Sequence, residues 1–243
     1  LACGERVLSL LEETPEVAER SDGETPRFEG AELDRVSFAY REEKILSEFS
    51  LQIDKGKVLG IHGASGSGKS TLLKLLMRFW DVQKGAVRIS GQDVRDIQTA
   101  ALREMTSYVT QDTVLFRDTI AKNIAVAKLD ATQAEIEAAA AKASIHDFIM
   151  SLPKGYETEL GELGDRLSGG EKQRIGLARA FLHEADFILL DEPTSNLDVL
   201  NEGIILKSLS EEKEGKTIVL VSHRQSTMSV ADCRYHMDNG RVS

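Results

Sequence analysis

Apolar and polar residues alternate through residues 28–54, near the beginning of the chain. The runs at 36–40 and 49–53 place an apolar residue at almost every second position. This period is typical of strands that bury one face and expose the other. The pattern therefore predicts a half-exposed antiparallel sheet over residues 28–54.

A different pattern follows, in which short and wholly apolar runs alternate with segments of helical period. The apolar runs are at 58–61, 187–190 and 217–221. Helices are predicted at 69–80 and 171–182, and residues 113–166 are mostly helical, with 134–143 rich in alanine. Strands that alternate with helices favour an α/β fold with a mainly parallel sheet. The helical block then reads as an insertion into that core.

The ends of the chain carry weaker patterns. Residues 5–13 have apolar positions at helical spacing and end before Thr14-Pro15, which predicts a short amphipathic helix, and a polar linker follows at about 18–27. Asn239-Gly240 predicts a tight turn. Because the chain begins at Leu1 rather than Met, we expect it to be a piece of a longer protein.

Composition narrows the classes of partner. A chain of 243 residues with 41% hydrophobic content can bury a sizeable core. The formal net charge of −10, without a basic run, disfavours nonspecific binding to nucleic acid or anionic lipid. Cys3 and Cys233 are too isolated to predict a metal site or a disulfide framework. No apolar stretch approaches the roughly 18 residues of a membrane span.

A glycine loop between the first apolar strand and its helix carries the clearest chemistry. It matches the pattern G-x-x-x-x-G-K-[ST] and consists of Gly63, Ala64, Ser65, Gly66, Ser67, Gly68, Lys69 and Ser70, with Thr71 next. Small residues let backbone amides curl around a polyphosphate, Lys69 adds a cation, and Ser70 offers a hydroxyl to Mg²⁺. The alternative is a glycine turn that caps a helix and carries a solvated lysine. The strand before the loop and the helix after it favour phosphate binding.

Two carboxylates, Asp191 and Glu192, follow an apolar strand. Ligands of open α/β sheets bind at this strand end. We expect Asp191 to hold Mg²⁺, directly or through water, and Glu192 to orient or deprotonate an attacking water. By itself such a pair would more often be a turn or a helix cap, and only the phosphate loop favours a catalytic role.

Three further side chains are candidates on weaker grounds. His223 follows the strand at 217–222, so it should emerge at the same sheet edge as Asp191, although a surface role is also common for such a histidine. Gln111 follows a strand-like run and could bind Mg²⁺ or water. Tyr40 could stack on a purine ring or equally pack across the sheet.

A second glycine turn lies at residues 167–174 and leads into the helix predicted at 171–182. Ser168, Gly169 and Gly170 supply a hydroxyl and two unhindered amides ahead of Glu171. A loop that feeds a helix N-terminus is a site for anions. The first loop already accounts for one set of phosphates, so the origin of a second set stays open on the residues alone.

Taken in order, these segments resemble one family, the ATP-binding cassette (ABC) ATPases. The resemblance covers about residues 28–243 and includes residues 195–198. It implies a P-loop core, an antiparallel β subdomain and a helical subdomain at about 113–167. Its motifs assign Tyr40 to the adenine contact, Gln111 to the Q-loop, Asp198 to the D-loop and His223 to the switch.

The resemblance also implies ATP, Mg²⁺ and a second cassette as partner. Two cassettes would sandwich two ATP molecules head to tail, with Ser168, Gly169, Gly170, Glu171 and Asp198 serving the partner's phosphate loop. Residues 111–116, 119–124 and 158–162 resemble exporters. Residues 5–13 resemble the cytoplasmic tail of the last transmembrane helix of exporters, so residues 1–27 are expected to be the tail of a preceding transmembrane domain. Transmembrane domains fused upstream, a place on the cytoplasmic face of a membrane and ATP-driven export are therefore expected, with no nucleic-acid partner.

Two positions depart from the family pattern. Leu163 replaces the usual arginine of exporters, and Asn196 replaces the usual alanine of the D-loop. The first puts one contact to the membrane domain in doubt, and the second is compatible with a homodimer or a heterodimer. Two other functions stay open: a soluble cassette that acts on nucleic acid or ribosomes, and a regulatory cassette with low turnover.

Overall fold

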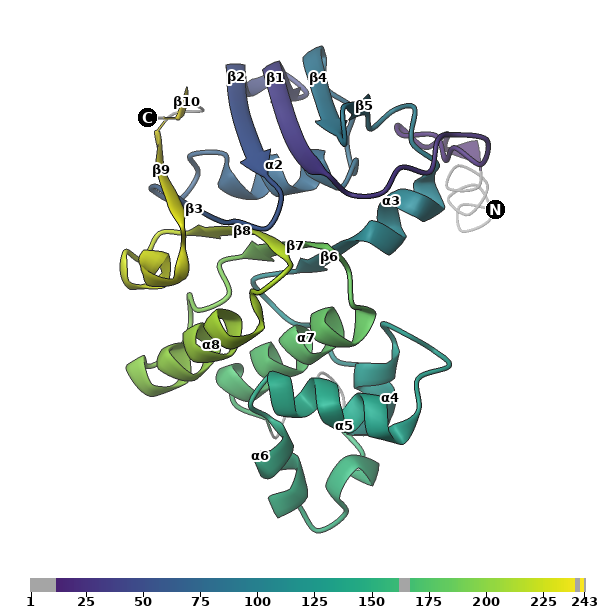
Figure 1. The fold of residues 1–243 in the computed structure, drawn as a ribbon, viewed down its shortest axis with the longest axis vertical. Coiled ribbons are helices and arrows are strands. Elements are labelled where there is room, and N and C mark those ends of the chain that lie inside the picture. The colour runs from purple at the N-terminus through teal and green to yellow at the C-terminus, as the bar shows by residue number, and fades with distance from the viewer. Residues whose placement is uncertain (1–11, 162–166, 239–240, 243) are drawn as a thin grey trace, which may run out of the picture.

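The computed structural model describes residues 12–161, 167–238 and 241–242, and it arranges two sheets and their helices in layers (Figure 1). Most of the predicted helix at 5–13, the turn at Asn239-Gly240 and the expectations for Cys3, Glu162 and Leu163 lie outside the described residues. Among the described residues, no helix is both long and apolar enough to cross a bilayer.

The antiparallel sheet predicted at 28–54 is confirmed and forms one outer layer of the molecule, but it also contains two strands at 84–93 that the sequence pattern did not predict (Figure 1). Its strands, in the order β2-β1-β4-β5, are β1 (Gly30–Tyr40), β2 (Glu43–Asp54), β4 (Lys84–Ile89) and β5 (Gln92–Asp93). Leu33 faces Leu51 across the β1–β2 pair, and both side chains are buried. The alternating pattern therefore turns one face of the sheet toward the interior.

The second sheet is parallel except at one edge. Its order is β10-β9-β3-β8-β7-β6, with β3 (Val58–His62), β6 (Thr106–Val109), β7 (Phe187–Asp191), β8 (Thr217–Ser222), β9 (Cys233–Asp238) and β10 (Arg241–Val242). Phe187 and Leu189 belong to one apolar cluster, while Ile188 and Leu190 belong to the other. Burial on both faces explains why these strands read as continuous apolar runs.

Helix α2 (Lys69–Leu76) lies between the two sheets (Figure 1). The sequence prediction placed its end at residue 80, and this was wrong by four residues. Arg78 takes a left-handed φ of 50°, which ends the helix and turns the chain. The turn directs Trp80 back against Tyr40, with ring centroids 5.3 Å apart.

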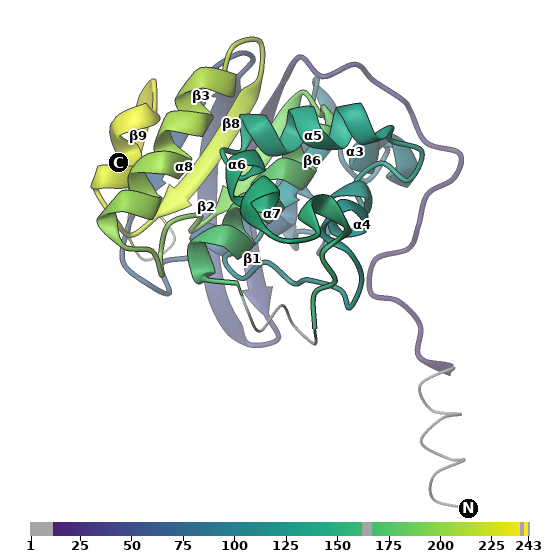
Figure 2. The ribbon, with the colours of Figure 1, turned by 90° about the horizontal axis from the view of Figure 1, so that it is seen from below.

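Helices cover the far face of the parallel sheet (Figure 2). They are α4 (Ile120–Ala125), α5 (Gln133–Lys142), α6 (His146–Ser151), α7 (Gly169–His183) and α8 (Val199–Glu212), with short 3-10 turns η1 (Gly155–Glu157) and η3 (Ser226–Val230). The predicted helical insertion is confirmed, because α4, α5 and α6 lie between strands β6 and β7 in the chain and share the cluster that contains Ile188.

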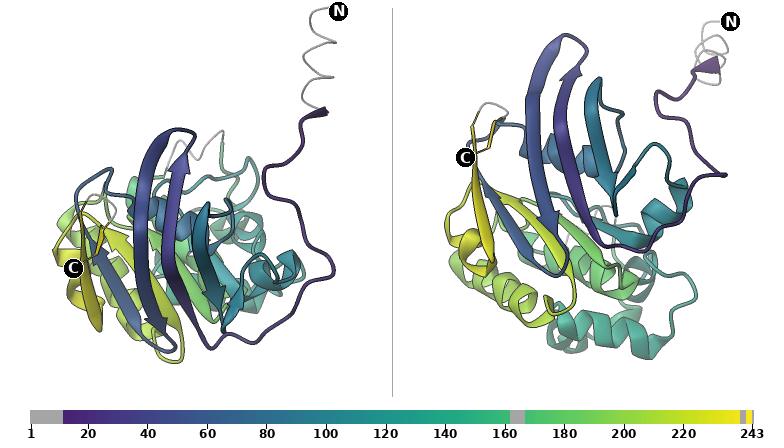
Figure 3. Two further views of the ribbon diagram at one scale, coloured as in Figure 1. Left: turned by 90° about the horizontal axis from the view of Figure 1, so that it is seen from above. Right: turned by 45° about the horizontal axis from the view of Figure 1, so that its top comes forward.

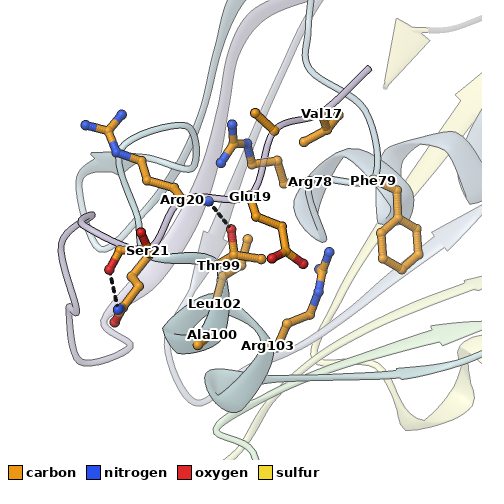
Figure 4. Close-up of a pocket in the computed structure, with 12 residues that line it drawn as sticks. Val17, Glu19, Arg20, Ser21, Arg78, Phe79, Thr99, Ala100, Leu102 and Arg103 are labelled. Carbon is orange, nitrogen blue, oxygen red and sulfur yellow. Dashed lines mark hydrogen bonds between the residues drawn. The ribbon is translucent and has the colours of Figure 1, made fainter. Parts of the chain in front are cut away.

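The segment that precedes the antiparallel sheet runs along the outside of the molecule toward helix α3 (Thr99–Met105) (Figure 3). It is attached by hydrogen bonds. The amide of Arg20 donates to Thr99 Oγ1 at 2.9 Å (Figure 4), and the Thr99 amide donates to the Arg20 carbonyl, also at 2.9 Å. Glu24 forms a parallel bridge with Ile97. The polar composition of this segment reflects its exposed position and not a lack of contacts.

A cavity of about 560 Å³ lies between this segment and α3 (Figure 4). Arg78 and Arg103 line it, and burial together with the charge of Arg78 lowers the pKa of Arg103. Arg103 also lies over the ring of Phe79, 5.0 Å from its centroid. The cavity is separate from the glycine loop, so its size does not identify the candidate site.

Candidate functional site

The glycine loop joins β3 to α2 and curls tightly. Gly66 and Gly68 have φ angles of 81° and 102°, which residues with a Cβ rarely adopt. At Gly63 the reason for glycine is space, since a Cβ there would lie 2.2 Å from the carbonyl oxygen of Met237. Backbone shape and close packing together therefore require the glycines of the motif.

Two polar side chains are buried inside this loop. Lys69 is 5% exposed, and its Nζ donates to the carbonyls of Gly63 and Ala64 at 2.8 Å each. The hydroxyl of Ser67 is buried and has no hydrogen-bond partner among the described residues. A buried hydroxyl without a partner is costly unless a ligand binds beside it, and the neighbouring ammonium favours an anionic ligand. The loop therefore fits a phosphate group.

Asp191 ends β7 and lies directly beside the start of α2. Ser70 Oγ donates to its Oδ1 at 2.8 Å, and the Tyr108 hydroxyl donates to its Oδ2 at 2.9 Å. A hydroxyl and a carboxylate are the oxygen ligands that Mg²⁺ prefers, so the pair fits that ion. Burial and the charge of Asp191 raise the pKa of Tyr108, which keeps its hydroxyl protonated.

Sequence reasoning missed Tyr108. It lies on β6, paired in register with Leu189 of β7. A signal was present in the chain, because Tyr108 belongs to the strand-like run that leads to Gln111, three residues further on. Only the strand order shows that β6 and β7 are neighbours and that the tyrosine can reach Asp191.

Glu192 lies between a lysine and a histidine. Its Oε1 is 3.7 Å from Lys69 Nζ, and its Oε2 accepts from His223 Nδ1 at 2.8 Å and from the His223 amide at 3.2 Å. The structure thus brings the predicted base and the switch histidine together at one sheet edge. A carboxylate only accepts, so Nδ1 of His223 carries the proton in this contact.

The backbone of Glu192 is itself unusual. Its φ of 49° lies in the left-handed region, which residues other than glycine seldom occupy. Its amide donates to the Val221 carbonyl at 3.0 Å, which holds this conformation in place. Such strain is often found at functional sites, where surrounding contacts impose it.

Gln111 faces the same region across a small cavity of about 280 Å³. The cavity is lined by Gln111 and Glu192 and also by Gly169 and Asn196. Gln111 is exposed, unlike Glu192, which is buried. The structure therefore places the weak candidate Gln111 close to the acidic strand end, and it places Asn196 at the mouth of the same cavity.

The second glycine turn has a separate exposed surface at the start of α7. Ser168 caps the helix: its Oγ accepts from the Glu171 amide at 3.3 Å, while Glu171 Oε2 accepts from the Ser168 amide at 2.7 Å. Ser168 and Gly169 are exposed. Gly170 is buried, and Asn201 packs so closely on it that a Cβ there would lie 2.6 Å from Asn201 Oδ1.

Asp198 caps α8 and connects to this turn through Asn201. It accepts from the Asn201 amide at 2.9 Å and from Asn201 Nδ2 at 2.7 Å, which lowers the pKa of Asp198. Asn201 Oδ1 accepts from Arg174 of α7 at 2.7 Å. The structure thus joins the two segments that were expected to serve a partner.

Tyr40 belongs to an aromatic cluster at the end of β1. It packs edge-on against Phe38 and Trp80, with centroid distances of 4.8 and 5.3 Å, and it lines a cavity of about 600 Å³. The packing alternative is therefore supported, and one side of the aromatic cluster also remains accessible.

A glycine loop with a buried lysine, set against paired carboxylates at the carboxyl edge of a parallel sheet, defines a P-loop ATPase. The chain matches the ABC transporter family over residues 46–195, and it belongs to that family. It is an ATPase domain of the kind found in ABC exporters.

Relatives of this chain support its assignment to ABC exporters. The chain is 58% identical to a "Probable ABC transporter ATP-binding/permease protein" of Haemophilus influenzae, over 100% of this chain and 44% of that protein. It is 42% identical to an "ATP-dependent lipid A-core flippase" of Syntrophus aciditrophicus, over 96% of this chain and 39% of that protein. The chain spans less than half of the length of these relatives.

A solved structure shows the same fold. The "Structure of a bacterial Atm1-family ABC exporter with ATP bound" superposes with a TM-score of 0.92 at 38% identity, and covers 99% of this chain and 42% of that one. The predicted P-loop α/β fold with its antiparallel and helical parts is therefore confirmed.

Proposed function

We propose that this chain hydrolyses ATP to power export across a membrane by the protein to which it belongs. The Lys69–Glu192–His223 group is the observation that carries the proposal, because it sets a cation, a carboxylate and an imidazole at one edge of the sheet. Residues 28–243 would form the ATPase domain and residues 1–27 its connection to transmembrane domains.

Each residue of the group has a separate role. The amides of residues 63–70, with Ser65, Thr71 and Lys69, would hold the phosphates of ATP. Glu192 would take the proton of the attacking water, and His223 would fix the orientation of Glu192 through the 2.8 Å contact. Tyr40 would contact the adenine ring from the aromatic cluster.

Ser70, Asp191 and Gln111 would hold Mg²⁺, with Asp191 acting directly or through water. Mg²⁺ when bound neutralises charge on the phosphates. The Tyr108 hydroxyl would keep one oxygen of Asp191 occupied and so fix the direction of the other.

A second cassette would complete the site. Ser168 and Gly169 are exposed, so their hydroxyl and amides are accessible to a second chain, whereas Lys69 and Asp191 are buried within this one. We propose a head-to-tail dimer in which Ser168, Gly169, Gly170, Glu171 and Asp198 act on the partner's ATP.

An exposed apolar surface would contact the membrane domain. Val114 is 60% exposed and Phe116 54%, and both line a cavity of about 450 Å³ between β6 and α7. Both belong to the segment that resembles exporters. The relatives named above are described as ATP-binding/permease proteins or as a flippase, which favours a place on the cytoplasmic face of a membrane over the nucleic-acid alternative.

Turnover as a function of concentration tests the dimer. For this chain by itself, ATP hydrolysis per molecule should rise steeply with protein concentration, while ATP binding should not. Constant turnover per molecule, measured far below the dimerisation constant, would contradict the shared site. Export is tested separately, by ATP-dependent transport into vesicles that contain the full-length protein.

A further inference from the structure

Arg224 follows the switch histidine directly and lies behind the candidate site. Its NH1 donates to the Leu197 carbonyl at 3.0 Å and to Glu202 Oε2 at 2.8 Å, and its own amide donates to Ser222 Oγ at 3.0 Å. One guanidinium therefore bridges three segments: the loop after β8, the loop before α8, and α8 itself.

Glu202 is the fixed end of this bridge. Its side chain is 9% exposed, and its second oxygen, Oε1, accepts from Ser226 Oγ at 2.6 Å and from Thr227 Oγ1 at 3.3 Å. A buried carboxylate with both oxygens satisfied is held firmly, whereas one that loses a partner is costly. Glu202 therefore gives Arg224 one preferred position.

Thr227 extends the network to the acidic strand end. Its hydroxyl lies 2.9 Å from that of Thr194, two residues after Glu192, and it also accepts from Ser222 Oγ at 3.4 Å. These hydroxyls are fully buried. The network therefore reaches the segment that follows Glu192 through buried hydroxyls.

The two loops that Arg224 joins carry different parts of the machinery. One begins with His223, whose Nδ1 contacts Glu192 at 2.8 Å. The other contains Leu197 and leads to Asp198, which the proposed function assigns to the partner's ATP. Because a single guanidinium contacts both, a displacement of either loop must break or stretch a charge-assisted hydrogen bond.

We infer that Arg224 is a positioning residue for ATP hydrolysis: it fixes His223 relative to the loop at 195–198, and so ties the chain's own site to the surface that serves the partner. The inference rests on the proposed function. The side chain of Arg224 contacts Leu197 and Glu202, and not the phosphate loop or Glu192, so it acts through its neighbours.

A guanidinium suits this task better than an ammonium. Its planar fork reaches two acceptors in fixed directions, whereas lysine offers a point charge on a flexible stem. Lysine at 224 should keep the ion pair with Glu202 and lose the definite geometry toward Leu197. Partial recovery by Arg224→Lys is therefore expected, and full recovery is not.

The experiment measures steady-state ATP hydrolysis by the full-length protein. Arg224→Met should lower kcat roughly 10-fold to 100-fold and leave the KM for ATP within about 2-fold, as expected when reacting groups are misplaced and ground-state binding is kept. Arg224→Lys should lie between this variant and the wild type. Arg88→Met is the matched control, since Arg88 is 34% exposed against 30% for Arg224 and also pairs with a carboxylate, Asp34, at 3.1 Å.

A cycle with His223 separates positioning from general stability. If Arg224 acts through His223, then Arg224→Met should lower turnover no further in a His223→Ala background. Turnover by Arg224→Met above half of the wild-type rate would overturn the inference, as would losses that multiply in the double variant. A loss by the Arg88 control as large as that of Arg224→Met would overturn it too.

Two further measurements keep these results distinct. If Arg224→Met does not fold because Glu202 is left charged and unpaired, Glu202→Gln/Arg224→Met removes that charge, and the same predictions apply to it. A wild-type protein without ATP hydrolysis would defeat the proposed function itself. A wild type that hydrolyses ATP, together with unimpaired Arg224 variants, would defeat only this inference.

Discussion

The two glycine turns of this molecule look alike in sequence but are built differently. The turn at 63–68 lies beneath β9 and encloses Lys69, whose ammonium has protein oxygens on two sides. The turn at 168–170 is exposed, and its cap is satisfied by its own helix through Glu171. The first turn therefore keeps its polar groups inside the chain, whereas the second leaves Ser168 and Gly169 exposed, as the proposed partner site requires.

The largest expected effect separates chemistry from binding in the first turn's site. Glu192→Gln keeps size and burial but removes the proposed base, so turnover should fall roughly 100-fold to 10,000-fold. ATP affinity, measured by titration calorimetry, should stay close to that of the wild type. Normal hydrolysis by this variant would sink the assignment of Glu192.

Binding itself is expected to depend on the buried cation. Lys69→Ala removes charge-assisted hydrogen bonds worth about 1.5–3 kcal/mol, so ATP affinity should fall roughly 10-fold to 100-fold. The measurement is direct binding of ATP to the purified protein. Affinity equal to that of the wild type would count against the phosphate loop, provided that circular dichroism shows an intact fold.

At the second turn, adding one methyl group should lower turnover without lowering ATP binding. Gly170→Ala would place a Cβ 2.6 Å from Asn201 Oδ1 and so disturb the contact between Asn201 and Asp198. The free energy of unfolding should fall by about 1–3 kcal/mol. Turnover should fall while ATP binding by the same chain is kept. Gly169→Ala is the steric control, because its nearest contact would be 3.7 Å away and its stability should be unchanged. Loss of ATP binding in Gly170→Ala would remove the distinction between the turns.

The cap of α7 gives a smaller effect on the same surface. Ser168→Ala loses the hydroxyl that accepts from Glu171, which should lower the free energy of unfolding by about 1 kcal/mol. Chemical denaturation of this variant and the wild type measures the difference. An unchanged stability would show that Glu171 alone satisfies the turn.

The smallest expected effect is on stability at acid pH, and it comes from Asp232, which lies outside both turns. Asp232 accepts from the Val58 amide at 2.8 Å, which is the main reason why its pKa is lowered, with help from Lys213. An aspartate whose pKa is lowered by folding stabilises the folded protein at any pH above its pKa in the unfolded chain, which is about 3.9. This contribution is lost as the pH falls through the pKa of the folded protein. Asp232 is partly exposed, so the loss should be below about 1 kcal/mol. Urea unfolding at pH 7 and pH 3 should show a smaller acid loss for Asp232→Asn than for the wild type.

Much of the fold was predictable because the periods of its segments differ. The two-residue alternation at 28–54 reflects burial on one face of a sheet. The wholly apolar β7 reflects burial on both faces, and the helical period of α7 reflects burial along one stripe. The end of α2 was not predictable in this way. A left-handed Arg78 ends the helix where Trp80 turns back onto Tyr40, and that contact comes from a distant strand.

By itself the sequence determined the local backbone of the candidate site, since motif spacing sets the glycine loop, the strand end at Asp191 and Glu192, and the cap at Ser168. Only the tertiary structure decided which of them meet. Strand order brings Tyr108 to Asp191 and His223 to Glu192, and side-chain packing joins Arg224 to Leu197 and Glu202. The physical reason is that local spacing controls backbone geometry, whereas contacts between segments far apart in the chain depend on how sheets and helices pack.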